Sequence, residues 1–385
     1  MDGGRRTDEH GLVRLAEQAL PDGLTHGPTR RFLAEQGLPA AGADLVFNGL
    51  GAERLQQLGP GEAADDGRWL VLGETDYCGT AVVLDGATGE VHLADRAGGE
   101  LLRDLIASDL PALAGLIREV ESVEPAARQT DSHGGRRGPA VVGEVIAAAE
   151  QRFRAIDPRL FEADTPPAHW PTALLVRALH WGARPGEPGT LAYEFEPELV
   201  AELAAVDGSG EVRRYQPQEL PAGLTHEPTR RLLTEVGLPL DGELFGVGAK
   251  PLRTMAEAHP GAATQRAHQR DYIAIGWWPH DLVVALDGAT GRLELPDWYD
   301  DGGPAAYLHR DLSALLYACW TYGRLRDEWA RWDRGAGDWE LFDPRALLGS
   351  HVDAMVEAVD PQAFETSDHS WRMLAEDPYT GGLLA

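Results

Sequence analysis

Only a few side chains in this sequence combine types and spacings that could perform chemistry. Asp131-Ser132-His133 contains the three residue types of a hydrolase triad, but its Gly-rich and polar surroundings offer no rigid element to preorganise them. His26 and His226 each stand four residues before an arginine, Arg30 and Arg230, and such a pair could serve as a base or a ligand. A histidine at a helix start is more often structural. Catalysis requires these side chains to converge on a concave pocket.

The motifs of the common enzyme and metal classes are absent. The sequence has no G-x-x-x-x-G-K-[ST] or G-x-G-x-x-G phosphate loop, no H-E-x-x-H or C-x-x-C metal pattern and no G-x-S-x-G elbow. The Asp-Gly-Ala-Thr-Gly segments at 85–89 and 287–291 each supply one carboxylate, too few oxygens for calcium. We therefore predict no catalytic residues, no metal site and no cofactor.

Aromatic residues in the second half of the chain supply a candidate binding surface. Eight of the eleven Trp lie at or beyond residue 277. Adjacent strand residues point to opposite faces, so Trp277 and Trp278 are not expected to share one core. If the ends of two neighbouring strands meet, they form an aromatic patch edged with acid, typical of protein interfaces. The predicted partner-binding residues are Trp277, Trp278, Asp281, Trp298, Tyr299, Asp300 and Asp301. A packed loop is the alternative.

The elements that position these residues occur twice. Residues 20–40 and 220–240 are identical at 15 of 21 positions. WLVLG at 69–73 then matches YIAIG at 272–276, and VVLDGATGEVHL at 82–93 matches VALDGATGRLEL at 284–295. Asp-Leu and Asp-Pro pairs follow in the same order. A period of about 200 residues is too long for a solenoid or a propeller, so the chain is predicted to hold two homologous tandem domains.

Each repeat begins with a predicted short helix. Thr25 or Thr225 is the expected N-cap, Pro28 or Pro228 suits the first turn, and Gly37 or Gly237 suits the position after the last turn.

A β-hairpin and further helices follow. β-rich runs flank each Asp-Gly turn, which is a strong hairpin signal. Apolar residues recur at helical spacing over 101–117 and from Leu312 to Cys319, and further helices are expected at 143–163 and 346–365. The fold class is therefore predicted to be α+β, with a mainly antiparallel sheet flanked by helices in each repeat.

The predicted domains are 1–185 and 190–385, separated in the Gly- and Pro-containing segment 182–190. Residues 124–140 are polar and rich in Gly and Pro, and we expect a flexible insertion within the first domain.

Charge limits the partners. Asp and Glu number 62 against 34 Lys and Arg, so the net charge is −28. This excess disfavours direct binding to nucleic acid or anionic membranes and favours cationic partners. Solubility alone is an equally simple explanation. Two cysteines, no hydrophobic N-terminal signal and no apolar run approaching ~18 residues predict a cytoplasmic protein with no membrane partner.

The order of motifs resembles the SUKH superfamily and is most similar to its fourth immunity family. L-P-x-G-L-T-H-x-P-T-R-R-x-L-x-E-x-G-L-P, a strand ending in Gly, L-D-G-A-T-G and a return strand carry this resemblance over roughly 12–125 and 195–345. The resemblance implies two tandem SUKH-like domains and a non-enzymatic immunity protein that neutralises a polymorphic toxin, often a nuclease or nucleic-acid deaminase. It transfers no catalytic residue and no interface residue.

The expected partner is thus a cognate toxin with a basic surface, which a protein of charge −28 can reach quickly. A tandem scaffold or regulatory binding module with a non-toxin partner is the alternative. An enzyme with an unrecognised site around His26 or His226 is the third hypothesis.

Overall fold

A computed structural model of the chain describes most of its residues. The described ranges are 5–7, 11–52, 54–58, 68–97, 100–128, 138–162, 167–186, 190–207, 210–242, 244–260, 267–296, 306–332, 341, 344–365, 370–371 and 376. The chain divides into two compact units. Unit 1 comprises Met1–Gln129, Glu144–Ala178 and Arg331–Ser350, and unit 2 comprises Thr130–Gly143, Leu179–Ala330 and His351–Ala385. The domain boundaries predicted from the sequence stay a prediction.

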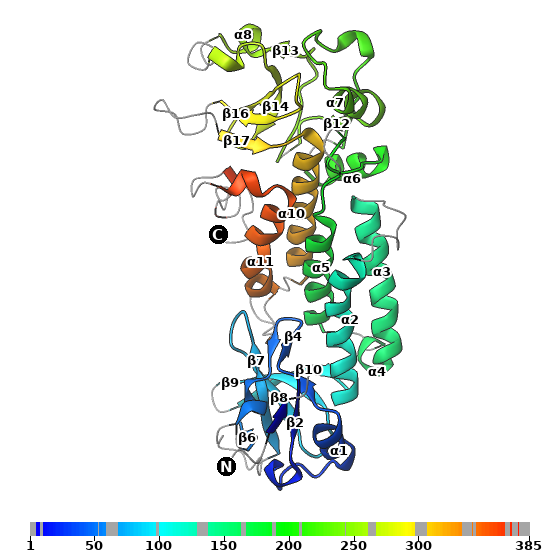
Figure 1. Cartoon of the computed structure of the whole chain (residues 1–385), viewed down its shortest axis with the longest axis vertical. Coiled ribbons are helices and arrows are strands. Elements are labelled where there is room, and N and C mark those ends of the chain that lie inside the picture. Colours follow the sequence, from blue (N-terminus) through cyan, green and yellow to red (C-terminus); the bar gives the residue numbers. More distant parts are fainter. Residues whose placement is uncertain are drawn as a thin grey trace. The chain divides into compact units, whose positions relative to one another are not determined.

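The first repeat is built on an antiparallel sheet in the order β10-β9-β8-β7-β5-β4, with β6 also paired to β7 (Figure 1). Its strands are β4 (Ala41–Gly42), β5 (Leu45–Val46), β6 (Gln56–Gln57), β7 (Trp69–Thr75), β8 (Ala81–Asp85), β9 (Val91–Ala97) and β10 (Glu100–Ala107). A smaller antiparallel sheet joins β1 (Arg5–Thr7), β2 (Leu12–Leu15) and β3 (Leu38–Pro39).

The helices of the first repeat are η1 (Glu17–Ala19), α1 (Gly27–Glu35), η2 (Asn48–Gly51), α2 (Leu110–Arg128), α3 (Pro139–Ile156), α4 (Pro158–Phe161) and α5 (His169–Gly182). Within unit 1, α3 runs beside α2 (Figure 1), and Arg152 of α3 pairs with Glu119 of α2 at 2.6 Å. Leu113 and Leu116 of α2 are fully buried, so this helix buries its apolar stripe in the core.

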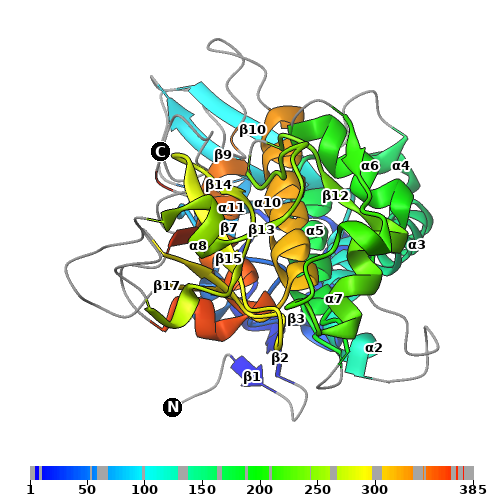
Figure 2. The same cartoon turned by 90° about the horizontal axis from the view of Figure 1, so that it is seen from above.

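The second repeat has a five-stranded antiparallel sheet in the order β13-β14-β15-β16-β17. Its strands are β13 (Arg253–Thr254), β14 (Ile273–Trp278), β15 (Leu282–Leu286), β16 (Leu293–Leu295) and β17 (Ala306–His309), and β11 (Val212–Arg213) pairs separately with β12 (Leu238–Pro239). Its helical segments are α6 (Pro197–Asp207), η3 (Pro217–Glu219), α7 (Glu227–Arg231), the short π-helix η4 (Leu232–Val236), α8 (Met255–Ala258), η5 (Ala267–Gln269), α10 (Leu312–Trp332), α11 (Pro344–Val359) and η6 (Pro361–Phe364). Figure 2 shows α8 beside the β13 edge of this sheet.

The α+β class, the two hairpins and most helices predicted from the sequence are confirmed. Gly37 and Gly237 adopt positive φ angles of 79° and 98° after the first helix of each repeat. The glycines that end the Asp-Gly turns, Gly89 and Gly291, do so too, at 85° and 84°.

Three local predictions are wrong. The first helix begins one residue later than expected, with His26 or His226 at the N-cap. Residues 101–107 belong to strand β10, because an apolar run before the turn at Ser108 pairs with β9 instead of starting α2. Residues 124–128 continue α2 and are no flexible insertion, while 129–137, which include Asp131-Ser132-His133, lie outside the described residues.

Candidate functional site

The duplicated L-T-H-x-P-T and D-G-A-T-G motifs form one structural joint in unit 1. The backbone N–H groups of Thr25 and His26 both donate to the Gly86 carbonyl at 2.8 Å, and the Thr25 hydroxyl donates to the same oxygen. The His26 Nδ1 shares a hydrogen bond of 2.7 Å with the Thr29 hydroxyl. A Cβ atom on Gly89 would lie 2.4 Å from this Nδ1, so only glycine lets the turn approach the histidine.

Unit 2 repeats this joint with its own residues. Thr225 and His226 donate to the Gly288 carbonyl at 2.8 Å, and His226 Nδ1 shares a hydrogen bond of 2.8 Å with the Thr229 hydroxyl. A Cβ atom on Gly291 would lie 2.6 Å from His226 Nδ1. Burial lowers the pKa of His226, which favours its neutral form. These duplicated histidines therefore tie a helix start to a hairpin turn, which is a structural role.

The duplicated Asp-Pro pairs also hold the scaffold. Asp157 accepts the backbone N–H of Ser108 at 2.7 Å, and Asp360 accepts the backbone N–H of Arg310 at 2.8 Å, at the corresponding position. Burial raises the pKa of Asp360, but the His309 ring 3.5 Å away and hydrogen bonds from the Tyr307 hydroxyl and the Arg310 backbone outweigh it and leave this pKa lowered. Each carboxylate therefore fastens the end of the last strand of its repeat to the start of a later short helix, α4 or η6.

Since the shared motifs are structural, the candidates for a binding site are residues that differ between the repeats. Trp277 on β14 is 44% exposed and is the one large hydrophobic side chain exposed among the described residues. Its neighbour Trp278 is 1% exposed and meets Trp371 edge to face, with ring centroids 4.8 Å apart. The expectation that the two indoles point to opposite faces is confirmed. Trp278 is a core residue in this structure, so its assignment to the partner-binding surface is corrected.

The other predicted surface residues divide into two groups. Asp281 is exposed in the turn between β14 and β15, where it and His280 adopt positive φ angles of 60° and 64°. Trp298, Tyr299, Asp300 and Asp301 lie outside the described residues. Trp277 and Asp281 are therefore the two predicted residues that the structure places on the surface.

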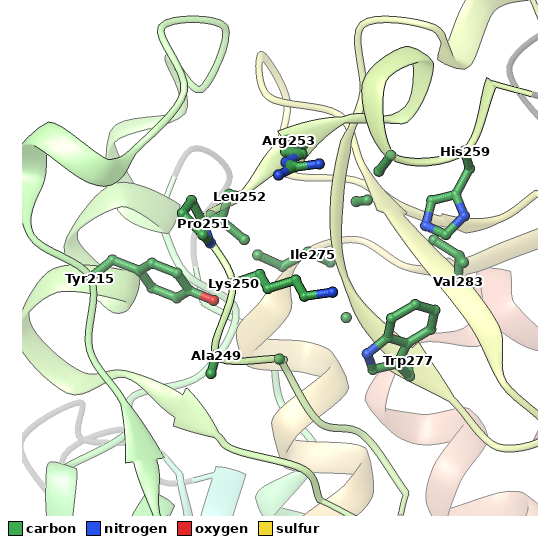
Figure 3. A pocket seen from close by; sticks show the side chains of 14 residues that line it. Tyr215, Ala249, Lys250, Pro251, Leu252, Arg253, His259, Ile275, Trp277 and Val283 are labelled. Carbon is green, nitrogen blue, oxygen red and sulfur yellow. The ribbon is translucent and has the colours of Figure 1, made fainter.

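Trp277 also forms a wall of a pocket in unit 2 with a volume of about 480 Å³ (Figure 3). Its lining comes from the segment before β13, from β13 itself, from the end of α8 and from the strands β14 and β15. The lining residues are Tyr215, Gly248, Ala249, Lys250, Pro251, Leu252, Arg253, Ala258, His259, Ala274, Ile275, Gly276, Trp277 and Val283.

The charged groups of this pocket are cationic, although the whole chain is strongly acidic. Lys250 and Arg253 are exposed at the rim, and neither makes an ion pair or a side-chain hydrogen bond within the described part of the chain. The His259 ring meets Trp277 at 85°, with centroids 5.9 Å apart. The described lining contains no Asp or Glu. The expected acidic edge around the aromatic patch is thus absent on this side of Trp277.

Tyr215 closes the pocket at its buried side. Its side chain is 1% exposed, and its hydroxyl has no hydrogen-bond partner among the described residues. Figure 3 shows this hydroxyl directed into the pocket toward Lys250. The Arg213 guanidinium lies 4.9 Å from the centre of its ring. Burial raises the pKa of Tyr215 to about 12 despite this neighbouring cation, so the hydroxyl keeps its proton at neutral pH.

Sequence reasoning missed this pocket because its residues differ between the repeats. The strands β6 and β13 pair with β7 and β14 in the same register, which aligns Gln56 with Arg253 and Val71 with Ala274. The same alignment sets Lys250 against Glu53, Trp277 against Glu74 and Tyr215 against Leu15. A signal was present, since Lys250 is the single lysine of the chain and lies in a segment, FGVGAKPLRTM, that parallels FNGLGAERLQQL.

Within the described residues, no three His, Cys, Asp or Glu side chains are grouped so that they could hold a metal ion. The described helices include none that is both long and apolar enough to cross a lipid bilayer.

The chain matches one family model twice. The model described as SUKH-4 immunity protein matches residues 5–176 and 199–377, which agrees with a tandem duplication. No curated protein and no solved structure matches the chain.

Proposed function

Because this chain belongs to the SUKH-4 immunity protein family, we propose that it binds a cognate toxin domain and blocks it by stoichiometric association, without catalysis. The duplicated histidines, the strongest candidates for catalysis in the sequence, are engaged in the helix-to-turn joint. This arrangement supports a binding role for the protein.

The single observation that carries the proposed binding surface is the exposure of Trp277. A large indole left 44% exposed on a strand costs solvation free energy that a protein contact recovers. Tryptophan is also among the residues that contribute most binding energy in interfaces. Asp281 lies exposed in the adjoining turn and supplies a charge for a cationic partner. We therefore place the toxin-binding surface at this end of the second-repeat hairpin.

The net charge of −28 supports a toxin with a basic surface. Enzymes that act on nucleic acid need basic clefts to neutralise phosphates. A nuclease or nucleic-acid deaminase domain of a polymorphic toxin, neutralised in the cytoplasm of the producing cell, fits this charge.

The test is calorimetric titration of the full chain with its cognate toxin domain. Trp277→Ala is expected to weaken the affinity about 30-fold, as for a contact of about 2 kcal/mol. Glu74→Ala, at the corresponding position of the first repeat, is the matched control and is expected to leave the affinity unchanged. Asp281→Asn is expected to slow association about two-fold at low salt.

Three outcomes would count against this proposal. Equal losses of toxin affinity in Trp277→Ala and Glu74→Ala would show that the toxin does not bind specifically to the second repeat. A toxin that leaves the wild-type chain unbound would favour the scaffold role with a non-toxin partner. Turnover of the toxin or of its substrate by the chain would contradict a non-catalytic role.

A further inference from the structure

The pocket beside Trp277 is lined by cations, whereas a surface that binds a basic toxin is expected to be acidic. We propose that it is a binding site for a small planar anion, namely a flat aromatic ring that carries a carboxylate or a phosphate. This inference goes beyond toxin neutralisation, because it gives the second repeat a ligand of its own.

The two cations at the rim would bind the anionic group of such a ligand. Lys250 and Arg253 have no partner within the described residues, so neither must break an ion pair to receive an anion. Arginine can bind a carboxylate or phosphate through two parallel N–H donors, and lysine adds a point charge. The described lining has no carboxylate that would compete. At physiological ionic strength, charges beyond roughly 8 Å are largely screened, so these local cations outweigh the distant acidic surface.

The apolar side chains of the pocket would contact the aromatic ring of the ligand. Trp277 presents an exposed indole to the pocket, and Ile275 and Val283 line the strands beside it (Figure 3). A flat ring can stack on such an indole with a gain of about 1–3 kcal/mol. The volume of about 480 Å³ lies within the usual range for small-molecule sites.

The buried hydroxyl of Tyr215 is an independent sign of a missing ligand atom. Buried polar groups almost always have a hydrogen-bond partner, and leaving one without costs about 1–3 kcal/mol. This hydroxyl has none among the described residues and is directed into the pocket. An oxygen or ring nitrogen of a bound ligand would accept a hydrogen bond from this hydroxyl.

The first repeat shows that the fold does not require these residues. Gln56, Glu74 and Leu15 occupy the positions of Arg253, Trp277 and Tyr215, and Glu74 accepts a hydrogen bond of 2.7 Å from Asn48. The cationic and aromatic set is therefore specific to the second repeat, as expected of a site with its own ligand.

The test is calorimetric titration of the full chain, without toxin, using two probes. Adenosine monophosphate represents ring phosphates, and indole-3-acetate represents ring carboxylates. At least one is expected to bind with one-to-one stoichiometry. Adenosine and free phosphate are the controls for ring and charge alone, and each is expected to bind at least about tenfold more weakly than adenosine monophosphate.

Variants locate the binding. Arg253→Gln and Trp277→Ala are each expected to weaken it about tenfold or more, and Tyr215→Phe about fivefold. Arg231→Gln removes an exposed arginine of the same unit outside the pocket and is the matched control, expected to leave affinity unchanged. Melting temperatures of all four variants check that each remains folded.

Stronger binding of one probe shows whether the pocket prefers a phosphate or a carboxylate, and supports the proposal. Absence of binding by both probes, or binding that the double variant Lys250→Gln/Arg253→Gln leaves intact, would overturn it. Since no toxin is present, either negative result leaves the immunity proposal standing. Conversely, loss of toxin binding by Trp277→Ala does not decide whether the pocket takes an anion.

Discussion

The two repeats keep the same joints and differ at one face. In both, a helix N-cap histidine shares a hydrogen bond with a threonine and packs against the glycine that ends a hairpin turn. Near the end of the strand that precedes this hairpin turn by one strand, the first repeat has Glu74 on β7 and the second has Trp277 on β14. Residues shared by both repeats serve the fold, and the proposed binding surface lies at a face where the second repeat differs from the first.

The two repeats also differ at one buried carboxylate. Asp85 of the first repeat is 1% exposed and pairs with Arg68, whose Nε lies 2.6 Å from a carboxylate oxygen. Its counterpart Asp287 is half-buried, and among the described residues its carboxylate accepts hydrogen bonds only within its turn, from Ala289 and Thr290. The residue corresponding to Arg68 is Asp271, so the second repeat cannot form this ion pair.

The largest expected effect comes from breaking the shared joint. A Cβ atom on Gly86 or Gly288 would lie 2.3 Å from the carbonyl oxygen of Gly23 or Gly223. Gly86→Ala and Gly288→Ala are each expected to lower the free energy of unfolding by about 2–3 kcal/mol, measured by chemical denaturation. Gly223→Ala, where an added Cβ meets no atom within 4 Å, is the control. A clear inequality between the two variants would show that the joints are not equivalent.

A smaller effect is expected from the buried charge that only the first repeat has. Burial raises the pKa of Asp85, but the Arg68 guanidinium and the turn amides outweigh it and lower this pKa from 3.8 to about 2. The ionised carboxylate therefore stabilises the fold above about pH 4, and this stability is lost as the pH falls toward 2. Asp85→Asn is expected to cost about 1–2 kcal/mol at pH 7 and almost nothing near pH 2.

Asp287→Asn is the matched variant and is expected to cost less than about 1 kcal/mol at pH 7. Urea denaturation from pH 7 to pH 2 measures both. A pH-independent loss in Asp85→Asn would contradict the role given to its charge.

The smallest effect on the free energy of unfolding is expected when the cations of the pocket are replaced. Lys250→Glu and Arg253→Gln install the residues of the first repeat at exposed positions without an ion-pair partner among the described residues. Each is expected to change the free energy of unfolding by no more than about 0.5 kcal/mol. A melting temperature lowered by many degrees would mean that these cations serve the fold instead of a ligand.

The sequence predicted the fold better than the site. The duplicated turns and caps carry strong local signals, since Asp-Gly turns and Gly after a helix meet backbone requirements that few residues satisfy. The strand β10 was mistaken for helix, because its leucines at 101, 102 and 105 recur at a spacing that fits both periods.

The site depends on contacts between segments distant in sequence. Trp277 and Trp278 are adjacent and of one residue type, and only the packing of Trp278 on Trp371 tells the core residue from the exposed one. Lys250 and Trp277 line one pocket because β13 pairs with β14, a pairing that their local patterns do not reveal.

The measurement that tests the central claim most directly is hydrogen–deuterium exchange of the full chain, alone and with its toxin domain. Slower exchange upon binding is predicted for peptides that cover the second-repeat hairpin, 273–283, while the matching peptides at 70–81 of the first repeat stay unchanged. Protection at 70–81 without protection at 273–283 would contradict the assignment of binding to the face where the second repeat has diverged.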